Sequence, residues 1–304
     1  MKELIFNAMN INYTIIIPHK DIPQLLQRCL ASIPQREDLQ IIVVDDNSDP
    51  TKVDFAHFPG LDCFDVECYF TKEGKGGGYA RNVGLKHARG KWLLFADADD
   101  FFHDNLLDSL DKWKDSERDI IYFGCDSVMS DTLEPTSSRI YDIRALSREN
   151  LFLPDWYVPW GKMLRSDLIN GHHILFDEVK YANDVMFSCL CEHYAGENID
   201  KCNSLIYCST VRADSLVYCN EPDNLITRFR VLISVNKRIR RWNLKCRYKD
   251  TFSYLNHENV DKGDYLRMLT YYLIHECFHV LFRDFVIVAK FHLKRIRIKM
   301  RLWN

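Results

Sequence analysis

The sequence predicts an α/β protein with a parallel, nucleotide-binding sheet, followed by a mainly helical extension. Three apolar segments each have the length and composition of a buried strand, and each is followed by a helix or a loop. Two of the three segments end in carboxylates. Beyond about residue 220 the stretches Leu225–Trp242 and Tyr265–Ala289 look helical with few turn signals, and the balance of charge reverses, which predicts the extension. In an open α/β sheet the carboxyl ends of parallel strands form the ligand-binding edge, so we expect the acids to gather there.

The first two strands and the helix between them are expected near the amino end of the chain. Residues 13–19 form an apolar run, and apolar side chains then repeat at helical spacing over residues 25–33. Residues 39–48 contain a second apolar run that ends in Asp45 and Asp46. We therefore expect a strand, a helix and a second strand, with both acids at the carboxyl end of that second strand.

A glycine-rich segment precedes the third strand. Four of the five residues from 74 to 78 are glycine, and such a loop can move or approach a ligand closely. A helix is expected from about Tyr79 to His87, which places Arg81 and Asn82 near its amino end. The apolar run from Trp92 to Phe95 then predicts the third strand.

Three carboxylates, those of Asp97, Asp99 and Asp100, follow the third strand within four residues. Charges of one sign this close together repel one another unless a cation or a ligand hydroxyl group joins them. Hard cations such as Mg²⁺ and Mn²⁺ bind oxygen ligands, commonly one or two carboxylates together with substrate phosphates. A metal-assisted diphosphate site is therefore one interpretation. A solvated turn that caps the next helix is the other.

Taken together, these segments resemble the inverting family 2 glycosyltransferases of the GT-A fold. The resemblance covers about residues 12–215, and its motifs occur in the family's order at residues 15–18, 28–33, 43–48, 78–84, 97–100, 160–163, 176–178 and 183–184. It implies a Rossmann-like sheet with flanking helices. It also implies a nucleotide-sugar donor, of the UDP-sugar class, and a divalent cation, Mn²⁺ or Mg²⁺.

The resemblance assigns roles in donor binding to residues at the strand ends. It implies that Asp46 holds the uracil ring and that Pro18 and His19 line the same base pocket. Asp97 would accept a hydrogen bond from the ribose or help to hold the cation. Asp99 would be the main protein ligand of a cation that bridges the donor diphosphate.

Four further roles follow from the resemblance. Arg81 and Arg212 correspond to basic residues near the nucleotide and its diphosphate. Asp184 occupies the position of the catalytic base, and Trp160 is a candidate wall of the acceptor site. Three of these residues have an alternative interpretation: a surface ion pair for Arg212, a helix amino cap for Asp184 and core packing for Trp160.

Two positions depart from the family pattern. Asn183 precedes the expected base, where the family usually has a glutamate. The first strand ends in Pro18-His19-Lys20-Asp21, whereas the family pattern is Pro-x-Tyr-Asn. Loss of that tyrosine changes the expected stacking on the base, but it leaves Asp46 to read the uracil edge.

Length and composition narrow the class of protein. A chain of 304 residues suits one domain of about two hundred residues with an appendage. No apolar stretch reaches the roughly eighteen residues that a membrane span needs, and residues 1–3 lead toward the first strand without a signal peptide. The 11 cysteines show no paired spacing, which predicts reduced thiols in a cytoplasmic protein rather than disulfides or a zinc site.

The charge of the chain is unevenly distributed. Residues 1–220 hold 22 Lys and Arg and 35 Asp and Glu, whereas residues 221–304 hold 18 and 8. Six basic residues are interleaved with apolar ones in the tail, residues 290–304, which predicts peripheral attachment to an anionic surface at the inner face of the cell membrane. The tail could instead bind a partner or the catalytic domain. The acidic first part argues against a nucleic-acid partner.

The sequence therefore predicts a metal-dependent, inverting glycosyltransferase. It would move a sugar from a nucleotide-activated donor to a hydroxyl of a glycan or lipid-linked acceptor in surface-polysaccharide synthesis. Residues 1–220 are expected to form the catalytic domain, with a nucleotide-sugar half (1–100) and an acceptor half (101–220), and residues 221–304 the extension. Two alternatives are open: a non-catalytic scaffold held to the membrane by its tail, and a sugar nucleotidyltransferase. The second would normally carry a glycine- and arginine-rich phosphate loop after its first strand, where this chain has none.

Overall fold

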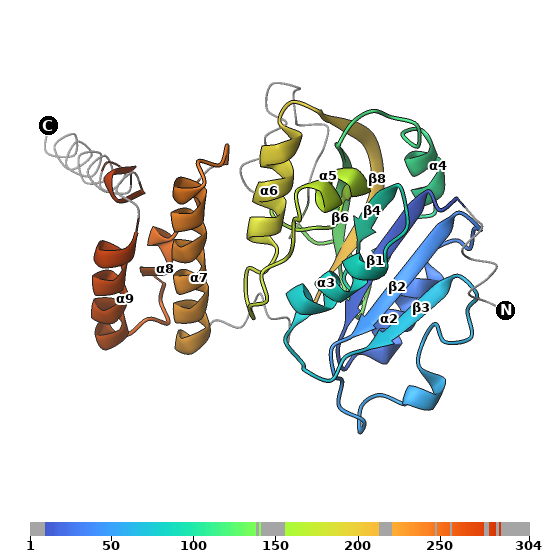
Figure 1. Cartoon of the computed structure of the whole chain (residues 1–304). Coiled ribbons are helices and arrows are strands. Elements are labelled where there is room, and N and C mark those ends of the chain that lie inside the picture. The colour runs from blue at the N-terminus through green and yellow to red at the C-terminus, as the bar shows by residue number, and fades with distance from the viewer. Residues whose placement is uncertain are drawn as a thin grey trace, which may run out of the picture. The chain divides into compact units, whose positions relative to one another are not determined.

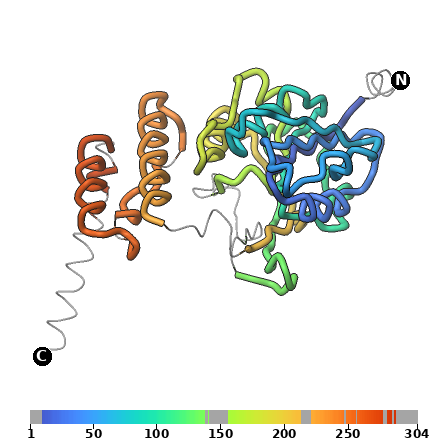
Figure 2. Tube along the Cα trace, turned by 90° about the horizontal axis from the view of Figure 1, so that it is seen from below, coloured from blue at the N-terminus to red at the C-terminus, as the bar shows by residue number. Residues whose placement is uncertain are grey.

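The computed structural model describes residues 10–137, 140, 156–212, 221–246, 248–255, 257–276, 280–283 and 286. The chain divides into two compact units, Met1–Ser215 and Leu216–Asn304. The first unit contains an eight-stranded sheet with helices, and the described part of the second unit contains helices alone (Figures 1 and 2).

The elements of the first unit alternate between strands and helices for most of its length. In chain order they are β1 (Tyr13–His19), α2 (Pro23–Ala31), β2 (Leu39–Asp45), the 3₁₀ helix η1 (Phe55–His57), β3 (Val66–Phe70), α3 (Gly77–His87), β4 (Trp92–Phe95), β5 (Phe101–Phe102), α4 (Leu106–Asp111), β6 (Ile120–Met129), β7 (Lys162–Arg165), α5 (Ser166–Gly171), α6 (Val185–Ala195) and β8 (Ile199–Val211). The strands and helices predicted between residues 13 and 95 are confirmed within a few residues at each end.

The sheet is mixed, with strand order β3-β2-β1-β4-β7-β6-β8-β5. Its first four strands are parallel, which confirms the parallel arrangement predicted for β1, β2 and β4. Strand β7 is antiparallel to both of its neighbours, β4 and β6, and β5 is antiparallel to β8. Strand β8 runs parallel to β6, with register shifts on either side of Gly124, so the second half of the sheet is organised around this long pair.

The order of the parallel strands places a crevice beside β1. Helix α2 leads from β1 to β2 on one side of it, whereas α3 leads from β3 back across to β4 on the other side. Right-handed crossovers in opposite directions put these two helices on opposite faces of the sheet, as Figure 1 shows. Ligands of open α/β sheets bind outside the carboxyl ends of the strands where the direction reverses. That point lies between β1 and β4, whose following loop carries the acids.

Burial on both faces explains why β1 and β2 form central strands. All seven residues of β2 are buried, as are all residues of β1 except Pro18. Such apolar runs are typical of parallel strands covered by helices on both sides. Helix α3 lies directly on this layer, because a Cβ atom at Gly84 would be only 2.5 Å from Cγ2 of Ile16. Glycine at that position lets the helix approach the sheet closely.

The second unit contains α7 (Pro222–Arg241), α8 (Phe252–Leu255) and α9 (Lys262–His275). Its small core contains the buried side chains of Phe229, Ile233, Leu255, Met268 and Tyr272. No helix in the described part of the chain is both long enough and apolar enough to cross a membrane. The tail, residues 290–304, lies outside the described residues.

One predicted helix of the second unit is interrupted. The sequence predicts a continuous helix from Tyr265 to Ala289, but α9 ends at His275, and Glu276 has an extended backbone. The Glu276 carboxylate is buried and accepts hydrogen bonds from Asn236 (3.0 Å) and Thr251 (2.8 Å). These buried bonds hold the chain away from the helical path, because an unpaired carboxylate at that depth would be costly.

Candidate functional site

Three aspartates lie together in the loop between β4 and β5, which we call the acidic loop (residues 97–100). One carboxylate oxygen from each of Asp97, Asp99 and Asp100 lies within 4.8 Å of the other two. The loop is closed by a turn in which the Asp100 backbone N–H donates to the Asp97 carbonyl over 3.0 Å. The acids therefore emerge together at the carboxyl end of β4, as the sequence predicts.

Asp100 is the buried anchor of the acidic loop. Its carboxylate accepts hydrogen bonds from the Tyr207 hydroxyl (2.7 Å) and the Thr210 backbone N–H (2.6 Å), both on β8. Burial raises the pKa of Asp100 well above its ordinary value, and the negative charges of Asp99 and Asp97 raise it further. Because Asp100 faces inward, the two partly exposed carboxylates of Asp97 and Asp99 are the ones available to a ligand.

Each of these two carboxylates is paired with an arginine. Arg81 Nη2 lies 2.5 Å from Asp97 Oδ1, and Arg212 Nη2 lies 3.0 Å from Asp99 Oδ2. The structure thus brings both sequence-predicted basic residues to the acidic loop, one from α3 and one from the end of β8. Arg212 does form an ion pair, as the alternative interpretation expects, and the partner is Asp99, the predicted cation ligand.

Arg81 also joins the acidic loop to the segment before α6. Its Nη1 atom donates to Asn183 Oδ1 over 3.1 Å. Gly78 permits this approach, because a Cβ atom there would lie 2.1 Å from the Asp177 carbonyl oxygen. The first turn of α3 therefore lies against residues 177–183, and the strand-end acids and the start of α6 become neighbours.

Asp184 is the amino-cap residue of α6, but its carboxylate makes no capping hydrogen bond to the described first turn of that helix. Burial raises the pKa of Asp184, while the positive charge of Arg81 opposes this shift. A carboxylate with a raised pKa and no role in helix capping can accept a proton. Asp184 thus has the backbone position of a helix cap, as the alternative interpretation expects, but its carboxylate does not cap α6.

Asp46 lies at the carboxyl end of β2 and is 2% exposed. One carboxylate oxygen, Oδ2, accepts a hydrogen bond from the Gly76 backbone N–H over 2.7 Å. The other, Oδ1, is buried and has no hydrogen-bond partner among the described residues. Because an unsatisfied buried acceptor is costly, this oxygen is suited to receive an N–H donor from a ligand. Pro18 on the neighbouring strand is partly exposed.

His19, which the resemblance assigns to the base pocket, lies at the end of β1. Its ring is buried; Nδ1 lies 2.7 Å from Asp45 Oδ2, and Nε2 accepts from the Ile22 backbone N–H over 3.2 Å. Both ring nitrogens are therefore engaged within the protein. Burial alone would raise the pKa of Asp45, but hydrogen bonds from His19 and Ser48 outweigh it and lower that pKa. His19 thus holds the strand end and the start of α2 together and presents neither ring nitrogen to a base.

Trp160 is likewise a core residue in this structure. It is 2% exposed, and its ring stacks on Tyr207 with ring centroids 5.1 Å apart. The ring therefore supports the tyrosine that anchors Asp100. A role as an exposed wall for a sugar would require this stack to open.

Comparison with known proteins identifies the family. Residues 14–174 match the family model described as Glycosyl transferase family 2. The chain belongs to glycosyltransferase family 2. Among curated relatives, the uncharacterized glycosyltransferase EpsJ of Bacillus subtilis is 26% identical over 191 residues, which cover 58% of this chain and 54% of EpsJ. The uncharacterized glycosyltransferase YibD of Escherichia coli is 24% identical over 208 residues, or 62% of this chain and 60% of YibD. The matched part thus spans little more than half the length of these relatives.

Solved structures share the fold of this family 2 chain. TarS 1–349 of S. aureus, in complex with UDP-GlcNAc, superposes with a TM-score of 0.63 at 18% identity, covering 88% of this chain and 74% of that chain. The mannosyltransferase PcManGT of Pyrobaculum calidifontis, in complex with GDP-Man and Mn²⁺, gives a TM-score of 0.56 at 15% identity, covering 97% and 84%. The predicted GT-A fold is therefore confirmed.

The sequence did not single out Lys162, which helps to hold the start of α6 in place. Lys162 is buried, and its ammonium donates to the Trp156 carbonyl (2.6 Å) and to Ser188 Oγ (3.2 Å). Burial lowers the pKa of Lys162, and the charge of Glu192 acts in the opposite direction. Because Ser188 lies in the first turn of α6, Lys162 positions the helix that begins after Asp184. The sequence signal that could have pointed to Lys162 is its place in the segment 160–163, which carries part of the family resemblance.

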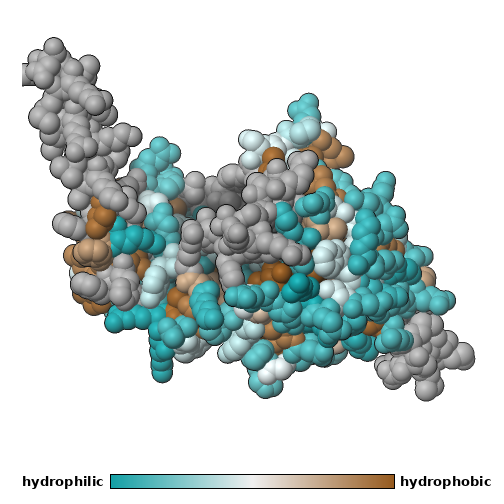
Figure 3. Space-filling view, turned by 90° about the horizontal axis from the view of Figure 1, so that it is seen from above, coloured by the Kyte–Doolittle hydropathy of each residue, from teal (hydrophilic) through white to brown (hydrophobic). Residues whose placement is uncertain are grey.

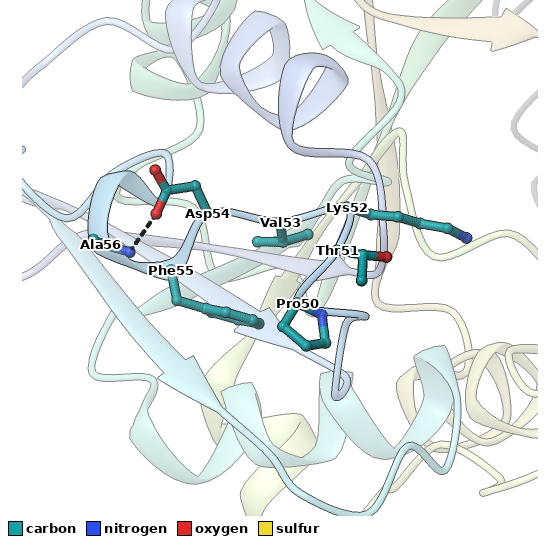
Figure 4. A pocket seen from close by; sticks show the side chains of 7 residues that line it. All are labelled: Pro50, Thr51, Lys52, Val53, Asp54, Phe55 and Ala56. Carbon is teal, nitrogen blue, oxygen red and sulfur yellow. Dashed lines mark hydrogen bonds between the residues drawn. The ribbon is translucent and has the colours of Figure 1, made fainter.

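A separate hollow of about 590 Å³ lies in the connection between β2 and β3. Figure 4 shows its lining, residues 50–56, with Asp54 directed toward the Ala56 backbone. That carboxylate accepts a 2.9 Å hydrogen bond from the Ala56 N–H and so caps η1. This acid therefore stabilises local structure, and the acidic loop, where three carboxylates meet, is the better candidate.

Proposed function

We propose that the chain transfers a sugar from a nucleotide-activated donor, a UDP-sugar, to a hydroxyl of a glycan or lipid-linked acceptor, with inversion at the anomeric carbon. The main support is the arrangement around Arg81, which bonds to Asp97 of the acidic loop and to Asn183, the neighbour of Asp184. Groups suited to a diphosphate and a group suited to proton transfer thus meet at one edge of the sheet. We assign residues 1–100 to the donor half, 101–220 to the acceptor half and 221–304 to the extension.

Recognition of the base is assigned to Asp46. Uracil presents one ring N–H, and Asp46 Oδ1 is one buried acceptor that lacks a partner among the described residues. A base N–H bonded there would remove the cost of that unsatisfied oxygen, while Gly76 keeps the other oxygen in place. This match supports a base with a single donor on that edge.

The acidic loop also fits a divalent cation. Carboxylate oxygens are the ligands that Mg²⁺ and Mn²⁺ prefer, and Asp97 and Asp99 would hold the ion. When bound, the cation would stabilise the charge that develops on the leaving nucleoside diphosphate. Arg212 occupies Asp99 Oδ2, so its side chain would turn from Asp99 toward the diphosphate.

Asp184 is assigned as the general base. It would accept the proton of the acceptor hydroxyl as that oxygen forms its bond to the anomeric carbon and the diphosphate leaves from the opposite face. A single displacement of this kind inverts the configuration. The raised pKa of Asp184 brings its basicity closer to the operating pH than that of an ordinary aspartate.

Calorimetry of UDP, GDP and CMP binding, with and without Mn²⁺, tests the donor site. Asp99→Ala should abolish metal-dependent UDP binding, whereas Asp104→Ala, at an exposed acid five residues further along the chain, should leave it unchanged. Release of UDP from a panel of UDP-sugars would then identify the donor. Absence of binding by all three nucleotides to the wild type would overturn the donor-site assignment and favour the non-catalytic scaffold.

Peripheral membrane attachment of the second unit is part of the proposal, since a lipid-linked acceptor would lie at the inner membrane face. Helix α9 exposes Leu266, Leu273 and Ile274, each about 60–70% exposed. Figure 3 shows brown, apolar surface among these helices. Apolar side chains beside basic ones are typical of proteins that bind anionic lipid. Co-sedimentation with vesicles that contain or lack anionic lipid tests this; equal binding to both would contradict it.

A further inference from the structure

Three potential metal ligands lie together outside the acidic loop. They are His103 at the end of β5, Asp126 on β6 and Cys208 on β8, and one ligand atom from each lies within 4.8 Å of the other two. His103 Nε2 is 2.9 Å from Asp126 Oδ1. We propose that these three side chains form a second cation site, selective for a thiophilic ion such as Zn²⁺.

The pairing of the strands explains why the three residues meet, although they are far apart in the sequence. Cys208 on β8 is the register partner of Asp126 on β6 and of Phe101 on β5. Two residues after Phe101, the His103 backbone N–H donates to the Ile206 carbonyl over 3.0 Å, which keeps the histidine beside β8. The cluster therefore rests on regular strand pairing rather than on a mobile loop.

The chemistry of the three ligands distinguishes this cluster from the acidic loop. Imidazole nitrogen, thiolate sulfur and carboxylate oxygen are the ligands that Zn²⁺ takes, with water as a fourth ligand in open sites. The acidic loop offers oxygen alone, which suits Mg²⁺ or Mn²⁺. The two sites, with different donor types, would therefore favour different ions.

Ion binding requires a simple rearrangement of protons. The hydrogen bond between His103 and Asp126 breaks, the imidazole proton is carried on Nδ1, and Nε2 donates its lone pair to the ion. The Cys208 thiol releases its proton to solvent and binds as a thiolate. Burial raises the pKa of that thiol, so in the absence of an ion it keeps its proton.

The position of the cluster suggests a structural role for the ion. The side chains of His103 and Asp126 are 31% and 36% exposed, whereas Cys208 is buried, so an ion can enter from solvent and meet the thiol at the base of the site. The bound ion would tie β5, β6 and β8 together. Tyr207 and Thr210, which anchor Asp100, flank Cys208 on β8. The ion would thus stiffen the strand that holds the acidic loop.

Titration of the chelator-treated full chain with Co²⁺ tests the proposal, because Co²⁺ bound to a thiolate in a tetrahedral site absorbs characteristically in the ultraviolet and visible. One equivalent should produce these bands, and Zn²⁺ should displace them. Cys208→Ser should abolish the thiolate band and weaken binding by at least about tenfold. Cys202→Ser, at a second buried cysteine on β8, should retain both.

The variants also cover the case in which Cys208→Ser does not fold. His103→Gln and Asp126→Asn alter partly exposed residues, and each should weaken Co²⁺ binding while circular dichroism shows native folding. A full band in Cys208→Ser, or no thiolate band in the wild type, would overturn the proposal. Unchanged Mn²⁺-dependent UDP binding in these variants would show that the acidic loop is a separate site.

Discussion

Arg212 Nη2 and Asp99 Oδ2 form a 3.0 Å ion pair between the end of β8 and the acidic loop. The pair joins two residues that we assign to the same donor diphosphate, one as a cation ligand and one as a phosphate ligand. In this arrangement the guanidinium occupies an oxygen that a metal ion would use. Arg212 and the cation are therefore competitors for Asp99 until a diphosphate offers the arginine another anion.

Arg212→Gln should strengthen Mn²⁺ binding in the absence of nucleotide and weaken UDP binding in its presence. Removing the guanidinium removes its competition for Asp99 Oδ2 and also removes a positive charge from the diphosphate site. We expect changes of about tenfold in each direction, or about 1.4 kcal/mol. Calorimetry measures both affinities. Arg118→Gln, at an arginine paired with Asp200 on another part of the sheet, is the control and should change neither. Weaker Mn²⁺ binding in Arg212→Gln would contradict the competition.

Asp184→Asn should lower kcat by about 10²–10⁴-fold and leave UDP affinity unchanged, because a general base acts on the acceptor hydroxyl and not on the nucleotide. Initial rates with the donor found in the UDP-sugar screen measure kcat, and calorimetry measures UDP affinity. Asp167→Asn, at a side chain that is 90% exposed, is the matched control. Full activity of Asp184→Asn would show that another residue is the general base.

The pH dependence of kcat/KM should show loss of activity on acidification, with an apparent pKa above 3.8. Burial raises the pKa of Asp184, and only the ionised form accepts a proton. The raised pKa of Asp184 also makes the stability of the folded protein depend on pH. A raised pKa in the folded state means that the wild type loses stability relative to Asp184→Asn as the pH rises from about 4 through that pKa. Urea denaturation of both proteins across this pH range measures the difference between their free energies of unfolding. A gain in the relative stability of the wild type as the pH rises would contradict the shift.

Asp46→Asn should weaken UDP binding about tenfold without affecting Mn²⁺ binding. The amide keeps one acceptor oxygen, so either Gly76 or the base N–H loses its acceptor, and an unpaired buried donor costs about 1–3 kcal/mol. Calorimetry with UDP and with Mn²⁺ separates the two effects. Asp49→Asn, at an exposed acid in the same loop, serves as the control. Equal losses of UDP and Mn²⁺ binding would indicate a general disturbance of the sheet edge.

Gly78→Ala should destabilise the first unit by about 1–3 kcal/mol and reduce donor binding. The added Cβ would lie 2.1 Å from the Asp177 carbonyl oxygen, so α3 would have to withdraw and carry Arg81 away from Asn183. Thermal or urea unfolding measures the free energy. Gly171→Ala is the matched control, because a Cβ atom there has no neighbour within 4 Å. Equal stability of the two variants would show that α3 and residues 177–183 can move apart at little cost in free energy.

The sequence predicted the parts of the fold that depend on local pattern. Strands β1, β2 and β4 follow from apolar runs, and the meeting of the acids after β4 follows from three carboxylates in four residues. Both features are determined by residues adjacent in the chain. The resemblance supplied the family, which the match over residues 14–174 confirms.

The rest depends on contacts between distant residues, which local patterns do not reveal. The bond from Arg212 to Asp99 joins residues 113 positions apart. The end of α9 is determined by a buried bond from Asn236 to Glu276, so helical periodicity alone predicted a longer helix. The residue types of His19 and Trp160 suit a ligand site, but local patterns do not reveal their contacts. Both side chains are buried; His19 bonds to Asp45, and Trp160 stacks on Tyr207.

The stack of Trp160 on Tyr207 should make the state of the acidic loop visible to fluorescence. The tyrosine hydroxyl donates to Asp100 and accepts from the Asp97 backbone N–H, so a change of charge in the loop alters the electric field at the indole ring. Intrinsic fluorescence should therefore shift when a cation or a nucleotide enters. The difference between the wild type and Trp160→Phe isolates this signal from that of the other five tryptophans. The protein thus carries an unlabelled reporter, suited to rapid-mixing measurements of how fast a donor enters and leaves.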